Sequence, residues 1–134
     1  MSTKSLILLI FFIICVKLLS CKSDTSGAND YLIDVDSIHA PDSVIANKAF
    51  DIVFFGVAGL NTCQHFKTFN IGYNQNDVHI EAWGTDDSNG RACGEAINYL
   101  NGYKVTLNLF PQGVYRILIR EPNATTLVKQ ILVK

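Results

Sequence analysis

The sequence contains little charge and no cluster of charges of one sign. Lys and Arg total 11 and Asp and Glu total 12 in 134 residues, so charged side chains make up 17% of the chain and the formal net charge is -1. A nucleic-acid-binding surface needs a basic patch that neutralises phosphates, and no such run occurs in this sequence. We therefore expect no DNA or RNA partner.

The common catalytic signatures are missing as well. The sequence has no G-x-S-x-G, no H-E-x-x-H and no glycine-rich phosphate loop, and its three histidines are dispersed. His79 and Glu81 would share one face of a strand, as an acid-base pair could, but alternation alone produces such pairs on a solvated face. We expect no enzyme and no cofactor.

The spacings of metal ligands are also absent. Neither C-x2-C nor H-x3-H occurs. The stretch from Thr85 to Gly90 is similar to part of a calcium loop, but Thr85 would stand at its first position and Ala96 at its twelfth, where carboxylates are needed. A run rich in Asp and Asn predicts a solvated turn instead.

No apolar run is long enough to span a bilayer as a helix. Lys4 precedes an apolar run from Leu6 to Val16, which is shorter than the roughly 20 residues of a transmembrane helix. This arrangement is typical of a signal peptide. The alternative, an uncleaved membrane anchor, is disfavoured because Lys17 interrupts any longer span.

The residues that follow resemble the lipobox of bacterial lipoproteins: Leu18-Leu19-Ser20-Cys21. In that family the cysteine is diacylated and becomes the new N-terminus. The resemblance implies a signal peptide over residues 1–20, a lipid on Cys21 and a location at the outer membrane, facing the periplasm or the cell surface. The chain as a whole is similar to small single-domain lipoproteins of Gram-negative bacteria.

Residues 21–30 are predicted to form a flexible tether between the lipid and a domain over residues 31–134. They are small and polar and lack apolar periodicity. Loss of the signal peptide removes Lys4 and Lys17 and leaves a mildly acidic chain, which anionic lipids do not attract. Attachment to the membrane would then come from the acyl chains, at about 0.8 kcal/mol per buried methylene.

Cys63 and Cys93 form an even pair in the exported part of the chain. Cys15 lies in the signal peptide and Cys21 would carry the lipid, so an oxidising compartment favours a disulfide between the other two. Such a bond stabilises a domain of this size by roughly 3 to 4 kcal/mol in the chain-entropy model. A metal site that includes His65 is the alternative, although thiolate ligation competes poorly with oxidation there.

From Tyr31 onward, the hydrophobic period is two rather than 3.6. Polar or turn-forming breaks interrupt this pattern roughly every ten to fifteen residues. The pattern predicts an all-β sandwich of about seven strands. The expected strands cover residues 31–38, 49–57, 64–73, 78–83, 103–109, 114–120 and 126–133.

Alternation also predicts which side chains face the core. These are Phe50, Ile52, Phe54, Val78, Ile80, Ala82, Val105, Leu107, Leu109, Tyr115, Ile117 and Ile119. The facing of the last strand stays open, because Lys129 and Gln130 interrupt both of its faces.

A short run resembles the corner of immunoglobulin-like and fibronectin type III-like domains at which a tyrosine hydroxyl caps the backbone. The run extends from Leu109 to Tyr115 and reads LFPQGVY. The resemblance implies an immunoglobulin-like β-sandwich over residues 31–134.

The strand over residues 49–57 predicts a binding surface. Its outward face carries three apolar residues, Val53, Phe55 and Val57. A contiguous apolar row marks an interaction surface unless another part of the chain covers it. If the row is open, we expect it to bind a partner or a second copy of the chain.

These observations predict a lipid-anchored, non-enzymatic binding or structural module of the cell envelope. Its partners would be the membrane, through the N-terminal lipid, and an unknown envelope protein or glycan. The alternative is a small inhibitor of a hydrolase that inserts the loop over residues 84–94 into an active site. Chagasin-like inhibitors share the immunoglobulin-like fold, but their N-P-T-T-G loop is missing here.

Two triplets match the D-S/T-aliphatic motif of O-glycosylation in Bacteroidetes. They are Asp36-Ser37-Ile38 and Asp42-Ser43-Val44. The sequence leaves open whether either serine is modified.

Overall fold

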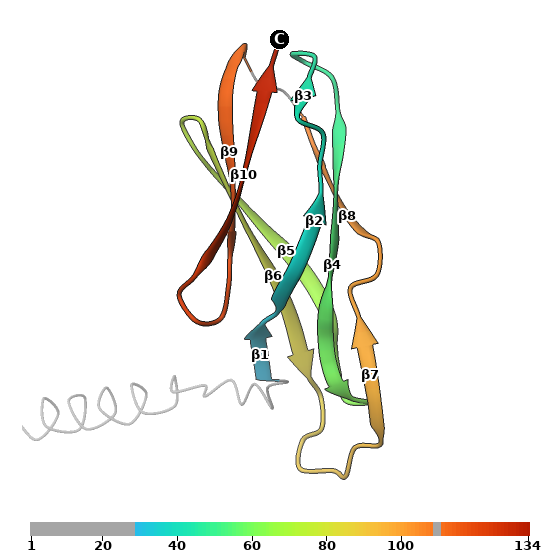
Figure 1. Cartoon of the computed structure of the whole chain (residues 1–134). Helices are drawn as coiled ribbons and strands as arrows, with labels where there is room; N and C mark the ends of the chain where they lie inside the picture. The colour runs from blue at the N-terminus through green and yellow to red at the C-terminus, as the bar shows by residue number, and fades with distance from the viewer. Residues whose placement is uncertain (1–28, 109–110) are drawn as a thin grey trace, which may run out of the picture.

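The computed structural model of the chain describes residues 29–108 and 111–134. The expected signal peptide, Cys21, most of the tether and Leu109 lie outside the described residues. The described part forms ten strands in two sheets and contains no helix, so the predicted all-β sandwich is confirmed (Figure 1). Among these residues, accordingly, no helix has the length and apolar character needed to cross a bilayer.

Strand β6 is the centre of the larger sheet. Strand β5 pairs with one edge of β6 along its whole length, and β9 and β1 share the other edge, β9 in parallel and β1 antiparallel. Strand β10 pairs with β9, and the short β3 pairs with β10. The strands of this sheet are β1 (Asn29–Leu32), β3 (Ser43–Val44), β5 (Gln64–Asn74), β6 (Asp77–Asp86), β9 (Gly113–Arg120) and β10 (Thr126–Val133).

Strand β4 is the centre of the smaller sheet, where β2 pairs with one edge and β7 and β8 share the other. All three pairings are antiparallel. The strands are β2 (Asp34–His39), β4 (Phe50–Asn61), β7 (Glu95–Tyr99) and β8 (Tyr103–Leu107). Strand β6 lies between β5 and β9 in the larger sheet, so β5 and β9 do not pair with each other.

The chain passes from one sheet to the other at Ile33. Ile33 links β1 to β2 in the sequence, and its side chain is buried. Its backbone N–H donates a hydrogen bond of 2.8 Å to the carbonyl of Ala82. The segment predicted as one strand over residues 31–38 is therefore two strands in different sheets. Strand β1 starts at Asn29, so the last two residues assigned to the tether belong to a strand.

Two strands were not predicted from the sequence, β3 and β7. In β7 the inward positions hold Ala96 and Asn98, while Ile97 and Tyr99 face outward and are exposed. The amide of Asn98 donates to the carbonyls of Asn61 and Gln64, at 2.9 and 2.6 Å. In β7 a polar residue faces inward and larger apolar residues face outward, which is the reverse of the usual alternation in a strand. Because of this reversal, the hydrophobic pattern did not predict β7.

The predicted core faces are confirmed wherever the structure describes them. All of the predicted inward residues are buried except Phe50, which is half-buried, and Leu109, which lies outside the described residues. The sequence left open which face of the last strand points inward. Ile131 and Val133 are buried, so the odd-numbered residues of β10 face the core. Aromatic rings pack against each other at one side of the core, where the ring centroids of Phe54 and Phe69 lie 4.6 Å apart.

Candidate functional site

The predicted binding row lies on the outer face of the smaller sheet. Val53, Phe55 and Val57 of β4 are each half-buried, whereas Ile52 and Phe54, which alternate with Val53 and Phe55, are buried. The neighbouring strands cover part of the row, and solvent reaches the rest. The row is therefore neither fully open nor hidden, and its role in binding stays a prediction.

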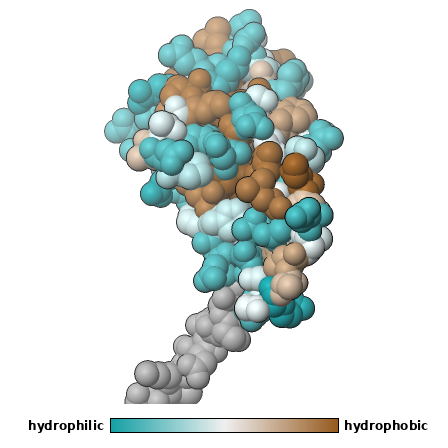
Figure 2. Space-filling model, turned by 60° about the horizontal axis from the view of Figure 1, so that its bottom comes forward, coloured by the Kyte–Doolittle hydropathy of each residue, from teal (hydrophilic) through white to brown (hydrophobic). Residues whose placement is uncertain are grey.

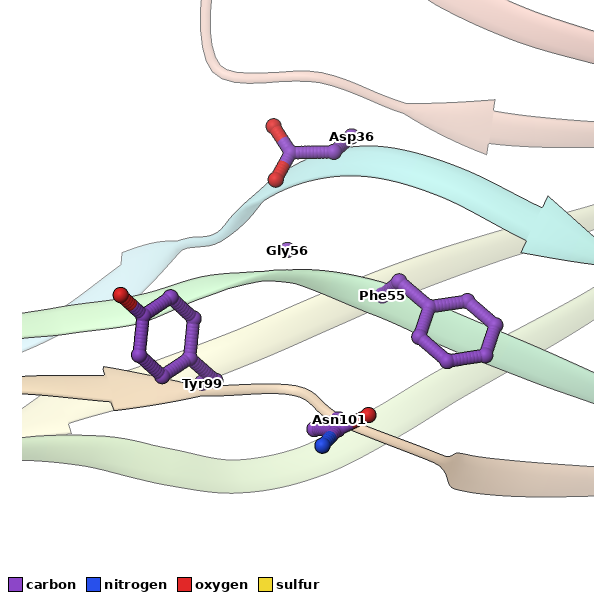
Figure 3. A pocket seen from close by; sticks show the side chains of 5 residues that line it. All are labelled: Asp36, Phe55, Gly56, Tyr99 and Asn101. Carbon is purple, nitrogen blue, oxygen red and sulfur yellow. The ribbon is translucent and has the colours of Figure 1, made fainter.

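A hollow of about 340 Å³ opens beside Phe55 on this face. We call it the outer-face hollow; its lining residues are Asp36, Phe55, Gly56, Tyr99 and Asn101. Figure 3 shows the four side chains arranged around Gly56, which itself has none. They come from β2, β4, β7 and the turn after β7, so three strands and a turn build the site.

A β-bulge places Asp36 at the rim of the hollow. The register between β2 and β4 shifts between Val35 and Ser37, so Asp36 is the extra residue of the bulge. Val35 is buried, and Asp36 and Ser37 are both exposed. In a regular strand two successive side chains would point to opposite faces, and one of the two would face the core.

Gly56 allows the strands to approach each other at the bulge. A Cβ at this position would lie 2.6 Å from the carbonyl oxygen of Asp34 and 3.3 Å from the Cα of Val35, both of them backbone atoms. The carbonyl of Gly56 also accepts a hydrogen bond of 2.9 Å from the backbone N–H of Leu100. Bare backbone therefore forms the floor of the hollow.

Two aromatic rings flank this floor. Phe55 is half-buried and Tyr99 is 59% exposed. Figure 3 shows both rings broadside, on either side of Gly56. Ile97, two residues before Tyr99 on the same face of β7, is 55% exposed and extends the apolar area. On the face presented in Figure 2, apolar side chains likewise reach the surface in groups among polar ones.

Three carboxyl groups gather behind the bulge, those of Asp34, Asp36 and Glu121. Glu121 follows the last residue of β9 and is only 7% exposed. Its Oε2 accepts a hydrogen bond of 3.1 Å from the backbone N–H of Val35, whereas no N–H group of the described residues donates to its buried Oε1. Burial raises the pKa of Glu121 from its ordinary value of 4.5 to about 7, with further contributions from hydrogen bonding to Asp34 and from the charge of Asp36.

These three carboxyl groups differ from most of the other acids in the fold. Across residues 29–108 and 111–134, no Lys, Arg or His nitrogen lies within 4.0 Å of a carboxylate oxygen of Asp34, Asp36 or Glu121. The cation of this face, Lys104, is paired with Asp51 at 3.4 Å. The acids that have cationic partners are Asp30, Asp42, Asp51, Asp77, Glu81 and Asp87.

The predicted cysteine pair supports the strand that carries Tyr99. The sulfurs of Cys63 and Cys93 lie 2.10 Å apart and their Cα atoms 5.7 Å apart, so the pair is confirmed at disulfide distance. Cys93 comes two residues before β7, and Thr62 and Gly94 exchange two hydrogen bonds of 2.9 Å next to it. The start of β7 is thereby fixed to the turn after β4.

The other motifs of the sequence do not join this site. Glu81 accepts hydrogen bonds from Trp83 at 2.9 Å and Arg120 at 2.8 Å, and its pKa is lowered chiefly by the bond to Arg120, so it is not poised as a base for His79. The loop predicted over residues 84–94 begins later, because β6 continues to Asp86. Over the described ranges, no three His, Cys, Asp or Glu side chains are placed to hold a metal ion.

Sequence reasoning found Phe55 but missed Asp36, Tyr99 and Asn101 as parts of the same site. Asp36 was noted because it begins a glycosylation triplet, and the structure leaves Ser37 of that triplet exposed. Ile97 and Tyr99 are two positions apart, and this spacing was the available signal for an apolar outward face on a second strand. No known family model, curated protein or solved structure matches this chain. The function therefore has to be argued from the site itself.

Proposed function

We propose that this chain is a non-enzymatic, lipid-anchored binding module of the bacterial cell envelope that docks a partner protein on the outer face of its smaller sheet. The observation that carries the proposal is the outer-face hollow, in which Phe55 and Tyr99 flank a bare stretch of backbone at Gly56. Aromatic side chains beside a small depression are typical anchors of protein interfaces.

The surroundings of the hollow support a docking role. Val53 and Val57 extend the apolar surface along β4, and Ile97 extends it along β7. Polar residues lie further along the same face, where Lys104 and Thr106 both donate hydrogen bonds to Asp51. An apolar centre with a polar margin is the usual composition of an interface.

The membrane attachment in this proposal rests on the lipobox-like residues that end at Cys21. The first described strand, β1, lies at the end of the sandwich where β6 ends and β7 begins (Figure 1). A tether that enters there would attach the sandwich at one of its ends rather than on the outer face of the smaller sheet. The immunoglobulin-like character of the domain belongs to the same proposal.

Capture of partners from native envelopes tests the docking role. Phe55→Asp places a charge inside the hollow, and we expect it to abolish capture of a protein that the unaltered chain retains. Val114→Asp is the matched control, because Val114 is 53% exposed on the opposite sheet. Capture that survives Phe55→Asp, or that both substitutions abolish equally, would contradict the proposal.

A second role, inhibition of a hydrolase, is favoured by one observation. The exposed loop after β6 is held in shape by its own hydrogen bonds: Asp86 accepts from the backbone of Ser88 at 2.9 Å, and the backbone N–H of Arg91 donates to the carbonyl of Ser88 at 2.7 Å. Preorganised loops bind at a lower entropic cost. In this role the captured protein would be a hydrolase, and its capture would depend on Arg91 rather than on Phe55.

A further inference from the structure

The outer-face hollow has a feature that a purely apolar docking surface would not need, an acidic rim without counter-charges. Asp36 lines the hollow, and the exposed Asp34 lies two positions before it on β2, next to the bulge. The nearby Lys104 is already paired with Asp51. An anionic ligand would be repelled at this rim, and a ligand with a positive charge would be attracted.

We infer that the outer-face hollow receives an arginine side chain of the partner protein, an inference that rests on the docking function proposed above. The carboxylate of Asp36 is the counter-charge for the guanidinium group, and the rings of Phe55 and Tyr99 supply flat faces for it to stack on.

The two rings are the part of the site that selects an organic cation. A cation held over an aromatic face gains about 0.5 to 1 kcal/mol at an exposed site and about 2 kcal/mol where water is excluded. Phe55 is half-buried, so one ring is partly shielded from solvent, while Tyr99 is open to it. A volume of about 340 Å³ accommodates one long side chain and is at the lower end of ligand pockets.

The polar lining favours arginine over lysine. The guanidinium group is planar, stacks on aromatic faces and presents its N–H donors in a fork that matches a carboxylate. The side-chain carbonyl of Asn101 and the hydroxyl of Tyr99 lie at the same hollow and are able to accept further N–H donors. A lysine ammonium is a compact, strongly hydrated charge and would use the flat rings less well.

A sugar ring is the nearest competitor, because its apolar face also stacks on aromatic rings. A neutral sugar would leave Asp36 without a counter-charge, and among the described residues no Lys, Arg or His is paired with this carboxylate. The charge of the rim therefore favours the cation, and a sugar becomes an outcome of the test.

Nuclear magnetic resonance titration of the ¹⁵N-labelled chain in detergent micelles tests the inference. The probe is a capped Gly-Arg-Gly peptide, and its matched controls are the same peptide with citrulline, which is isosteric but uncharged, the same peptide with lysine, and a neutral disaccharide. We expect the arginine peptide to shift the amide resonances of Gly56, Tyr99 and Asn101. Its affinity should exceed that of the citrulline peptide about fivefold, which corresponds to roughly 1 kcal/mol.

Substitutions in the same titration locate the counter-charge. Asp36→Asn should weaken binding of the arginine peptide about fivefold, the loss of roughly 1 kcal/mol. Asp42→Asn should leave it unchanged, because Asp42 directly precedes β3 of the larger sheet and already pairs with Lys129. Equal binding of the citrulline or lysine peptide, an unchanged affinity in Asp36→Asn, or shifts caused by the disaccharide alone would each overturn the inference.

Capture from envelopes separates this inference from the docking function. If Phe55→Asp abolishes capture and Asp36→Asn does not weaken it, the arginine inference is wrong and the docking function stands. If capture survives Phe55→Asp, the docking function itself is wrong. Loss of capture in Phe55→Asp and weaker capture in Asp36→Asn, with full retention in Asp42→Asn, supports both.

Discussion

The carboxylate of Glu121 accepts a hydrogen bond of 3.1 Å from the backbone N–H of Val35 and so joins the end of β9 to the bulge in β2. Val35 belongs to the smaller sheet and Glu121 directly follows a strand of the larger sheet, so this contact connects the two sheets near the point where the chain passes from β1 to β2. It also holds the bulge that directs Asp36 to the outer-face hollow. The geometry of the proposed site thus depends on a buried acid on the opposite sheet.

The raised pKa of Glu121 predicts that stability falls with rising pH. The carboxyl titrates near its ordinary value of 4.5 in the unfolded chain and near 7 in the folded one. Between these values the folded state holds the proton and the unfolded state has released it, so the free energy of unfolding decreases as the pH rises from about 4.5 to about 7 and is level above that. Urea denaturation at several pH values measures this slope.

Glu121→Gln is the variant that isolates the effect, because an amide keeps an acceptor for Val35 and carries no charge at any of these pH values. We expect its stability to be level between pH 5 and pH 7.5 and to exceed that of the unaltered chain at the upper end. Acids with lowered pKa values, such as Asp77 and Glu81, stay ionised in this window and do not add to the slope. The same slope in both proteins would show that Glu121 is not its source.

Replacement of Gly56 by alanine should disturb the bulge. The added Cβ would meet the carbonyl oxygen of Asp34 at 2.6 Å, so β2 or β4 has to shift. We expect a loss of about 1 to 3 kcal/mol in the free energy of unfolding, as for other overpacked sites. Gly72→Ala is the matched control, because a Cβ there would have its nearest neighbour at 4.0 Å. Equal stability of the two variants would mean that the strands tolerate the extra methyl group.

Loss of the disulfide should destabilise the domain and free the start of β7. Cys63 and Cys93 are 30 positions apart, for which the chain-entropy model gives about 3 to 4 kcal/mol. The double substitution to alanine should lower the free energy of unfolding by this amount, and hydrogen exchange should show the largest loss of protection at Glu95 to Tyr99. Two titratable thiols in the oxidised, denatured protein would instead show that the pair is not bonded.

Acylation is expected at Cys21. Metabolic labelling with palmitate should mark the unaltered chain and should disappear in Cys21→Ser, since no other cysteine stands in a lipobox-like context. Cys15→Ser is the control and should retain the label. Labelling that persists in Cys21→Ser would contradict the lipid anchor.

The sequence predicted the core of this fold because the core follows simple alternation. Ile52 and Phe54 in β4, and Ile117 and Ile119 in β9, all lie on the predicted faces. Alternation failed where the backbone departs from a regular strand. The passage of Ile33 between the sheets ends β1 and begins β2 without any polar break, so one long strand was expected.

The site was harder to predict than the core for the same reason. The bulge changes the period of β2, so alternation gives no reason to place Asp36 and Ser37 on the same face. The side chains of Asp36, Phe55 and Tyr99 come from three different strands. Whether they lie side by side depends on the register in which these strands pair. The hydrophobic pattern does not determine that register, least of all for β7, which the sequence did not predict. The burial of Glu121 left no signal either, since acids at strand ends are usually exposed.

The most direct test of the docking function is photo-crosslinking from position 99 in intact cells. A benzophenone amino acid in place of Tyr99, which is 59% exposed at the hollow, should form a covalent adduct with one envelope protein. The same amino acid in place of Val114, which is 53% exposed on the other sheet, should not form this adduct. The adduct at position 99 should also disappear when Phe55→Asp is introduced. No adduct from position 99, or the same adduct from position 114, would contradict a partner on the outer face of the smaller sheet.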